Sequence, residues 1–406
     1  MIIQKCQLCG SKNLKLVIDL GFHPLADTFL KDLKEEEVLY PLQVLLCQKC
    51  GYTTLSNIVS APIRYQKTDY SYTSSNSPVA VAHFKELAQQ VIQQIKITEK
   101  DLVVDIGSNV GTLLKEFREQ SKCKIVGVDP SPNIVKLAKK DNMPTIQDFF
   151  SKSVVQKIVK KHGKAKAITC NNTFNHINDL NEFMKNIDKL LTKDGCFVFE
   201  TPYLFDLVKN LSFDTIYLEH VSYFSVKPFQ KFFEKFGFFI QHLEVNNYQG
   251  GSIRVYLSRQ KENKNLVEKY LKAEESAKIF DIKTYEKMMD KVSDLKFELC
   301  RKIYVIKAKG KKIIGIGAAA KGNTLLNYCK IDNTLIDFIT DSSPLKIGKF
   351  APGSHIPIKD DKDITPGIEF ALLLPWNIAE FLKKKLKHLN LKFIVPKIIN
   401  QSLRSL

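Results

Sequence analysis

The sequence lacks any unbroken apolar run of about 18 residues, the length that a membrane-spanning helix needs, although 44% of its residues are hydrophobic. Its first residues, MIIQKCQLCG, also lack the basic and then apolar pattern of a secretion signal. We therefore expect a cytoplasmic protein with no membrane partner. With 406 residues the chain is too long for one ordinary core, so two or three domains are expected.

Arginine is scarce, because only six of the 61 basic residues are Arg and the rest are Lys. The net charge of +18 would suit a nucleic-acid partner, but Arg is the better side chain for bidentate contacts with phosphates and bases. The lysines alternate with Asp and Glu in helical stretches, so we interpret the charge as solvated surface and expect no nucleic-acid partner. The six arginines are Arg64, Arg118, Arg254, Arg259, Arg301 and Arg404.

The nine cysteines fall into two groups. Four of them form two matched Cys-x-x-Cys-Gly knuckles near the N-terminus, and two knuckles supply four thiolates for a tetrahedral zinc ion, whereas a thioredoxin-like redox site needs only one pair. Four protein ligands leave no open position, so this zinc is expected to be structural. The predicted ligands are Cys6, Cys9, Cys47 and Cys50. The cysteines expected to be buried free thiols are Cys123, Cys170, Cys196, Cys300 and Cys329.

Short apolar runs alternate with amphipathic segments over residues 100–258, which predicts a mostly parallel α/β sheet. Residues 262–308 are charged, periodic and free of Gly and Pro, so one or two long helices are expected there. A second α/β alternation follows. The predicted class is α/β, with a zinc-binding lobe at 1–70, a central Rossmann-like domain at 71–260, a helical connector at 261–310 and a Rossmann-like domain at 311–406.

Three elements in order indicate which ligand the domain at 71–260 binds. The segment LVVDIGSNVGTLLKEF reads as a strand, a glycine-rich loop and a helix whose N-terminus offers free N–H groups; a Rossmann dinucleotide loop would carry one more glycine. The second strand ends in an acid that can bind a ribose diol, and D-F-F follows the third strand, where an adenine could lie. This order resembles class I S-adenosylmethionine (SAM) methyltransferases. The candidate SAM residues are Asp105, Gly107, Ser108, Asn109, Gly111, Asp129, Asp148 and Phe149.

The segment YLEHVSYF is dense in groups that handle protons, with Tyr217, Glu219 and His220 within four residues. Histidine is the usual general base at neutral pH, and tyrosine can stabilise an oxyanion. In an extended strand Glu219 and His220 would face opposite sides, whereas a turn would let the three side chains converge. His176 follows the fourth strand, where the [DNS]-P-P-[YF] motif of DNA amino-methylating enzymes is absent. A polar loop with packing aromatics is the alternative interpretation.

Motifs along the whole chain resemble those of nucleotide-sugar C-methyltransferases, which act on 4-keto deoxysugars in antibiotic and surface-glycan pathways. Besides the cysteine knuckles they are DLGFHPLADTF, DYSYTSSNS, DIGSNVGTLL, YLEHVSYFS, NYQGGSIRVY and GIGAAAKGNTLLNY. One departure is Val110, where an acid often stands. The resemblance implies zinc, SAM, a small-molecule sugar nucleotide as partner, and a C-terminal domain that helps to hold it. We expect a monomer.

C-methylation requires a base to remove a proton beside the ketone, and the resemblance places it at C3; the enolate then attacks the SAM methyl. We assign His220 as the base, with Glu219 orienting it or positioning a sugar hydroxyl. Tyr217 and His176 are expected to hydrogen-bond the ketone oxygen, and Tyr70 to act in the sugar pocket. The predicted substrate-binding residues are Tyr72, Asn247, Lys321 and Asn323.

A second glycine-rich loop begins at Gly315 and, read alone, suggests a dinucleotide site, with Asp341 about 20 residues on as the acid. Lys321 at the helix start suits a phosphate. We interpret this domain as facing the sugar nucleotide's diphosphate, with bound NAD as the alternative. The alternative activity is O- or N-methylation of a nucleotide sugar or a related small molecule, which needs no ketone.

Overall fold

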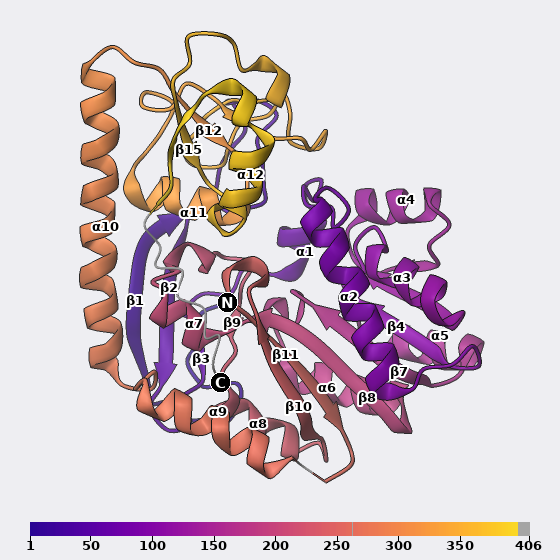
Figure 1. Ribbon diagram of the computed structural model, residues 1–406. Helices are drawn as coiled ribbons and strands as arrows, with labels where there is room; N and C mark the ends of the chain where they lie inside the picture. The colour runs from indigo at the N-terminus through magenta and orange to yellow at the C-terminus, as the bar shows by residue number, and fades with distance from the viewer. Residues whose placement is uncertain (262, 397–406) are drawn as a thin grey trace.

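The computed structural model of the protein describes residues 1–261 and 263–396 (Figure 1). Arg404 and the end of the expected C-terminal domain lie outside the described residues. The described chain forms a four-stranded, a seven-stranded and a five-stranded sheet. The predicted mixed α/β class, with a cysteine-containing N-terminal lobe and two Rossmann-like domains, is confirmed.

The N-terminal sheet takes its last strand from a distant part of the chain. Its order is β1-β2-β3-β9, and the pairing is antiparallel. Strand β9 lies directly after the YLEH segment, so this segment is held against the cysteine-containing lobe. The elements are β1 (Leu14–His23), β2 (Tyr40–Cys47), β3 (Thr53–Leu55), β9 (Ser222–Tyr223) and the short helix α1 (Ala61–Tyr65).

The central sheet has the order β10-β11-β8-β7-β4-β5-β6. The strands from β4 to β8 are parallel, and β11 lies antiparallel between β8 and β10. Chain order reverses between β4 and β7, and such a switch point opens a crevice at the carboxyl ends of the strands. The strands are β4 (Leu102–Ile106), β5 (Lys124–Asp129), β6 (Thr145–Gln147), β7 (Ala165–Asn171), β8 (Leu191–Pro202), β10 (Phe239–Asn246) and β11 (Ser252–Ser258).

Amphipathic helices cover this sheet. Helices α2 and α3 share one apolar cluster with Val103 and Val198 of the sheet, and α5, α6 and α8 bury their apolar sides in the larger cluster. The helices are α2 (Pro78–Ile95), α3 (Thr112–Ser121), α4 (Pro132–Lys140), α5 (Lys152–His162), α6 (Leu180–Leu190), α7 (Leu204–Lys209) and α8 (Val226–Glu234).

The C-terminal sheet is parallel, in the order β14-β13-β12-β15-β16. It has its own switch point between β12 and β15, and α11 begins at the second glycine-rich loop. The elements are β12 (Ile313–Ile316), α11 (Ala320–Cys329), β13 (Ile339–Thr340), β14 (Ile358–Lys359), β15 (Phe370–Leu373), α12 (Ala379–Lys385) and β16 (Lys392–Ile394).

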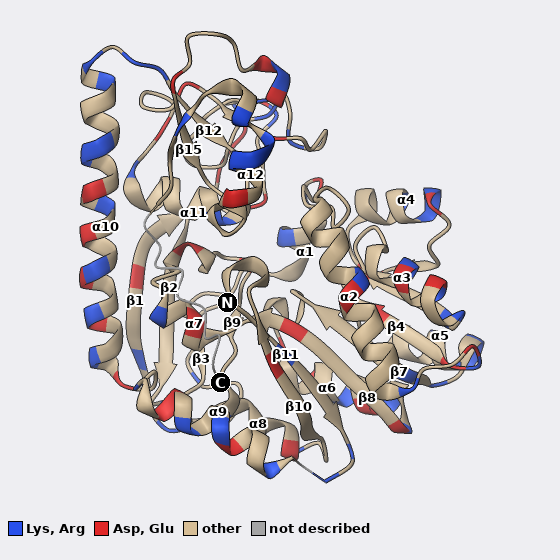
Figure 2. Ribbon diagram, viewed as in Figure 1, with Lys and Arg blue, Asp and Glu red and all other residues tan. Residues whose placement is uncertain are grey.

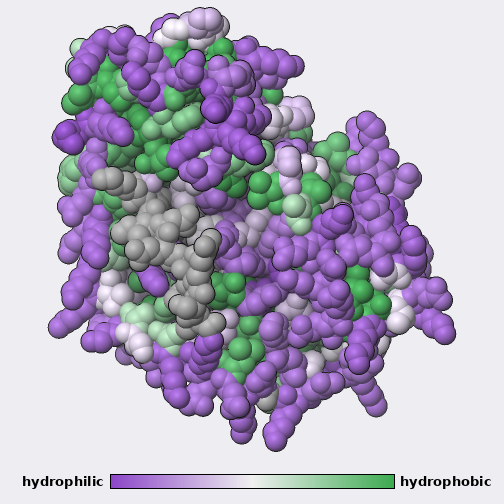
Figure 3. Space-filling model, viewed as in Figure 1, coloured by the Kyte–Doolittle hydropathy of each residue, from purple (hydrophilic) through white to green (hydrophobic). Residues whose placement is uncertain are grey.

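Two helices, α9 (Lys264–Ser276) and α10 (Ile282–Ala308), join the central and C-terminal sheets, as the charged periodic segment predicted. Figure 1 shows α10 standing beside β1. Basic and acidic residues are interspersed along the ribbon of α10 in Figure 2. The face in Figure 3 is mainly hydrophilic, with apolar side chains more frequent over the C-terminal domain. None of the described helices combines the length and apolarity needed to cross a bilayer.

Candidate active site

The four N-terminal cysteines meet at one point of the lobe. The Sγ atoms of Cys6 and Cys50 lie 3.6 Å apart, as do those of Cys9 and Cys47, and all four atoms lie within 4.8 Å of one another. A tetrahedron with Zn–S bonds of 2.3 Å would separate its sulfurs by about 3.8 Å. The donor set and its spacing therefore fit a zinc ion. Of the other cysteines, Cys300 is only half-buried, whereas the remaining four are buried free thiols as expected.

A cavity of about 880 Å³ lies between the two Rossmann-like domains. Its walls include residues at the carboxyl ends of β4, β5 and β7 on one side, and of β12 and β13 on the other. The switch-point crevices of both sheets thus open into one space. Its volume is in the range typical of small-molecule sites.

The first crevice is built around the loop after β4. Gly107 has a φ of +71°, and a Cβ at this position would lie 2.2 Å from Thr173 Oγ1. The Asp129 carboxylate accepts from the backbone N–H groups of Asn109, at 3.0 Å, and Ser131, at 2.9 Å. Burial raises the pKa of Asp105 to about 7, although the Thr169 hydroxyl donates to it. These contacts fix the loop against the ends of the strands.

Seven of the eight predicted SAM residues line the cavity, and the exception is Gly111, which lies against Met143. Ser108 Oγ and both polar atoms of the Asn171 side chain are buried and have no hydrogen-bond partner among the described residues. Such groups need partners, which a polar ligand can supply. The crevice therefore fits SAM. The predicted SAM residues that line the cavity are Asp105, Gly107, Ser108, Asn109, Asp129, Asp148 and Phe149.

The substitution Gly107→Ala is expected to weaken SAM binding at least about 10-fold, since the added methyl group meets Thr173 at a strained positive φ. Gly163→Ala is the matched control, because Gly163 also has a positive φ, of +84°, but has no atom within 4 Å of the added Cβ. Isothermal titration calorimetry with SAM measures both variants. Equal SAM affinity of a folded Gly107→Ala protein and the wild type would contradict the placement of the cofactor.

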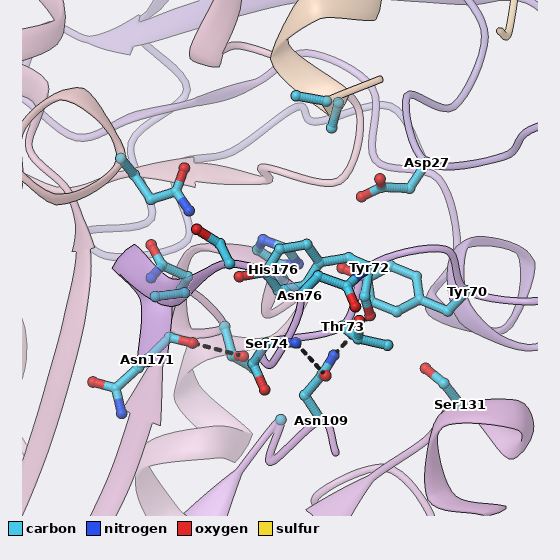
Figure 4. A pocket seen from close by; sticks show the side chains of 18 of the residues that line it. Asp27, Tyr70, Tyr72, Thr73, Ser74, Asn76, Asn109, Ser131, Asn171 and His176 are labelled. Atoms are coloured by element: carbon cyan, nitrogen blue, oxygen red, sulfur yellow. Dashed lines mark hydrogen bonds between the residues drawn. The ribbon is translucent and has the colours of Figure 1, made fainter. Parts of the chain in front are cut away.

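The residues of the YLEH segment form a turn, in which the His220 N–H donates to the Tyr217 carbonyl at 2.9 Å. The turn brings the two side chains into contact, with ring centroids 3.7 Å apart and ring planes inclined by 36°, and places the His220 ring 5.0 Å from that of His176. All three rings line the cavity together with Tyr70. Figure 4 shows Tyr70, Tyr72 and His176 grouped, with Asp27 nearby. Four of the five predicted catalytic residues therefore converge.

The protonation of His220 follows from its backbone contact. Its Nδ1 lies 2.8 Å from the Thr215 carbonyl oxygen, which can only accept, so Nδ1 carries the proton and Nε2 keeps a lone pair. Burial lowers the pKa of His220 to about 3, and burial also lowers the pKa of His176, which His220 and Arg64 lower further. Both imidazoles are therefore neutral at neutral pH.

Glu219 is placed differently from the expectation. It does not line the cavity, and its carboxylate accepts from the backbone N–H groups of Ala26, at 3.3 Å, and Asp27, at 3.0 Å. Thr215, not Glu219, thus holds the His220 ring. Burial, and next the charge of Asp27, raise the pKa of Glu219 to about 7. Glu219 anchors the segment that brings the Asp27 carboxylate to the cavity wall, a residue that the sequence showed only as part of DLGFHPLADTF.

Two further residues of the site, Arg64 and Tyr65, were missed from the sequence. Tyr65 lines the cavity, and its hydroxyl lies 2.5 Å from His176 Nδ1. The guanidinium of Arg64 is buried and donates to the Tyr65 hydroxyl and to the Glu219 carbonyl. Arg64 is the first arginine of an arginine-poor chain and precedes the next by more than 50 residues. This isolated position was the feature of the sequence that could have indicated a specific role for Arg64.

Three of the four predicted substrate residues, Tyr72, Asn247 and Lys321, line the cavity, and of these Lys321 lies on the C-terminal domain, in α11. Lys321 Nζ donates to the Gln249 carbonyl at 3.0 Å and to Asn377 Oδ1 at 3.1 Å, and burial lowers its pKa to about 8. Asn323 does not reach the cavity wall, because its Nδ2 donates to the Ala26 carbonyl at 2.8 Å. Asn323 therefore joins the C-terminal domain to the N-terminal lobe.

Comparisons with known proteins cover the same three regions. Family models match as a zinc binding domain at residues 6–65, a methyltransferase domain at 81–243 and a C-methyltransferase C-terminal domain at 247–396. C-methyltransferase NovU of Streptomyces niveus is 33% identical over 403 residues, which cover 97% of this chain and 95% of NovU.

Two solved structures are similar to part of the chain at low identity. A SAM-dependent methyltransferase from Clostridium acetobutylicum ATCC 824 is 14% identical, covers 45% of this chain and 92% of its own, and gives a TM-score of 0.37. The PH0226 protein of Pyrococcus horikoshii OT3 is 16% identical, covers 47% of this chain and 95% of its own, and gives a TM-score of 0.38.

Proposed function

The chain belongs to the family of SAM-dependent C-methyltransferases, and on this premise we propose that it methylates C3 of a nucleotide-linked 4-keto deoxysugar. C-methyl transfer is the activity named for NovU, the relative that aligns with 97% of this chain. Our proposal adds that the methyl acceptor is a sugar nucleotide, that it contains a ketone and that C3 is the carbon methylated.

The observation that carries the proposal is the orientation of His220. Its Nδ1–H is bound to the Thr215 carbonyl, which leaves Nε2 as a proton acceptor in a buried cavity. A carbon beside a ketone needs such an acceptor for its proton and hydrogen-bond donors for the oxygen that gains charge. Tyr217 and His176 lie next to His220 and supply donors. O- or N-methylation would not require this combination.

The cavity joins the crevices of two sheets, which supports a methyl acceptor that carries a second large group besides the sugar. The SAM residues occupy one side, and the loop after β12, with Lys321, faces them from the other. A sugar placed between them would leave its nucleotide beside the C-terminal domain, where a buried cation can offset the diphosphate charge. Bound NAD is not needed for this arrangement.

In the proposed reaction His220 Nε2 takes the C3 proton and becomes an imidazolium. A pKa of about 3 makes this imidazole a weak base while the cavity contains no substrate. The negative charge that forms on the neighbouring ketone oxygen stabilises the imidazolium, while Tyr217 and His176 hold that oxygen. SAM, when bound, supplies the methyl group that the carbon takes up. The zinc ion proposed for the four cysteines has a structural role only.

The function is tested by incubating the protein with SAM and nucleotide-linked 4-keto-6-deoxysugars, followed by mass spectrometry and NMR of the product. We expect a gain of one methyl group on carbon, and deuterium incorporation at C3 when the same sugars are incubated in D2O. A control sugar nucleotide with a hydroxyl in place of the ketone should show neither. Methylation of that control on oxygen or nitrogen, without exchange at C3, would instead establish the alternative activity.

A further inference from the structure

A buried arginine lies behind the active-site histidines, and all of its N–H groups are bound within the protein. Arg64 is 3% exposed. Its Nε donates to the Val59 carbonyl at 3.1 Å. Nη1 donates to the Tyr65 hydroxyl at 3.2 Å and to the Glu219 carbonyl at 3.1 Å, and Nη2 to the His176 carbonyl at 3.2 Å and to Asn178 Oδ1. A guanidinium has five N–H donors and no acceptor, so every contact has a fixed direction.

This direction favours Tyr65 as the donor to His176, because the buried Tyr65 hydroxyl needs an acceptor for its own proton. The Tyr65 oxygen accepts from Arg64, and its single proton is free to point at His176 Nδ1, 2.5 Å away. Nδ1 then accepts, so the ring proton of a neutral His176 resides on Nε2. Nε2 is buried and has no partner among the described residues, and His176 lines the cavity.

We propose that Arg64 and Tyr65 are positioning residues that hold His176 as the Nε2–H tautomer, so that Nε2–H donates to the ketone oxygen of the substrate. The substrate half of this inference rests on the proposed function, whereas the tautomer does not. His176 remains neutral throughout, because it donates a hydrogen bond and transfers no proton; the C3 proton goes to His220.

The contacts of the two histidines give them different roles. His220 presents a proton acceptor to the cavity, and His176 presents a hydrogen-bond donor. The Thr215 carbonyl requires a proton on Nδ1 of His220, whereas the Tyr65 hydroxyl, which already accepts from Arg64, has its proton available for Nδ1 of His176. Their rings are 5.0 Å apart, so a proton acceptor and a hydrogen-bond donor face the same part of the cavity. An enolate requires this pairing, since its carbon loses a proton while its oxygen gains charge.

The tautomers are measured by long-range ¹H–¹⁵N NMR of the full-length protein labelled at histidine nitrogens, without substrate. His176 signals are assigned by their loss in His176→Gln. We expect an unprotonated Nδ1 and a protonated Nε2 for His176, and the reverse for His220. In Tyr65→Phe the His176 signals should shift towards a mixture of both tautomers. Tyr223→Phe is the matched control, because the Tyr223 hydroxyl is buried and has no partner within the described part of the chain.

Kinetics provide the second readout. Tyr65→Phe should lower kcat about 10- to 100-fold, the usual cost of losing a supporting hydrogen bond behind a functional histidine, with the KM for the sugar nucleotide changed less than about threefold. A His176 with its proton on Nδ1 in the wild type overturns the inference, whatever the activity. The expected tautomers in a protein that methylates no ketosugar would leave the positioning role standing and refute the proposed function alone.

Discussion

His220→Ala is expected to lower kcat about 10²- to 10⁴-fold, the contribution of a positioned general base, while SAM affinity stays within about twofold of the wild type. The loss follows from the removal of the Nε2 lone pair, which the Thr215 carbonyl keeps free for the C3 proton. SAM binding should persist, because the hydrogen bonds that hold Asn109 of the loop after β4 against Asp129 do not involve His220. Steady-state rates and calorimetry measure the two quantities.

The same substitution should abolish deuterium exchange at C3 in D2O, because exchange requires only proton removal. His162→Ala is the control, since His162 ends α5 and does not line the cavity. The neutral form of His220 persists above a pKa of about 3, so its ionisation in the free enzyme should not limit kcat/KM at pH 5 or above. Exchange that continues in His220→Ala would show that His220 is not the base and would point to Asp27, which also lines the cavity.

Local motifs predicted the parts of the site that neighbouring residues build. The cysteine knuckles, the loop at Gly107 and the acid at Asp129 each depend on a few adjacent positions, and all of them lie where the motif placed them or line the expected crevice. The turn at Tyr217–His220 was one of two conformations that the sequence allowed. Its short polar segment carries no periodicity long enough to distinguish a strand from a turn.

Residues that act through distant partners could not be predicted in the same way. Glu219 looked like a partner of His220 because the two are adjacent, but the N–H groups that it binds come from residues 192 and 193 positions away. Asn323 likewise binds a carbonyl 297 positions away. These pairings depend on how three sheets pack together, and no local pattern encodes that packing. Arg64 and Tyr65 belong to the same class, since α1 reaches His176 only in the folded protein.

The pairing of β3 with β9 connects the cysteine-containing lobe to the predicted catalytic residues. The Thr54 hydroxyl donates to the Val221 carbonyl at 2.8 Å, and the Leu55 N–H donates to the same carbonyl at 2.9 Å, directly after His220. The lobe that contains the cysteines therefore holds both α1 and the turn that carries the proposed base, His220. A structural metal in this lobe should affect methyl transfer although its ligands lie outside the cavity wall.

Cys47→Ser is accordingly expected to reduce bound zinc from about one ion per chain to near zero and to abolish methyl transfer, while leaving most SAM binding intact. Structural zinc sites contribute about 10–16 kcal/mol of binding free energy, which is as large as the whole free energy of unfolding of a typical domain, about 5–15 kcal/mol, so the lobe should lose its fold when the ion is lost. Metal analysis, circular dichroism and turnover measure the three effects.

Cys300→Ser is the matched control, because Cys300 is a half-buried free thiol outside the cluster and should keep both zinc and activity. Chelation of the wild-type protein should reproduce the effect of Cys47→Ser, and added zinc should reverse it. A Cys47→Ser protein without metal that still methylates at the wild-type rate would show that the β3–β9 pairing and α1 hold the turn unaided. In that case the dependence of catalysis on the metal, inferred from the contacts of Val221 and Arg64, would be wrong.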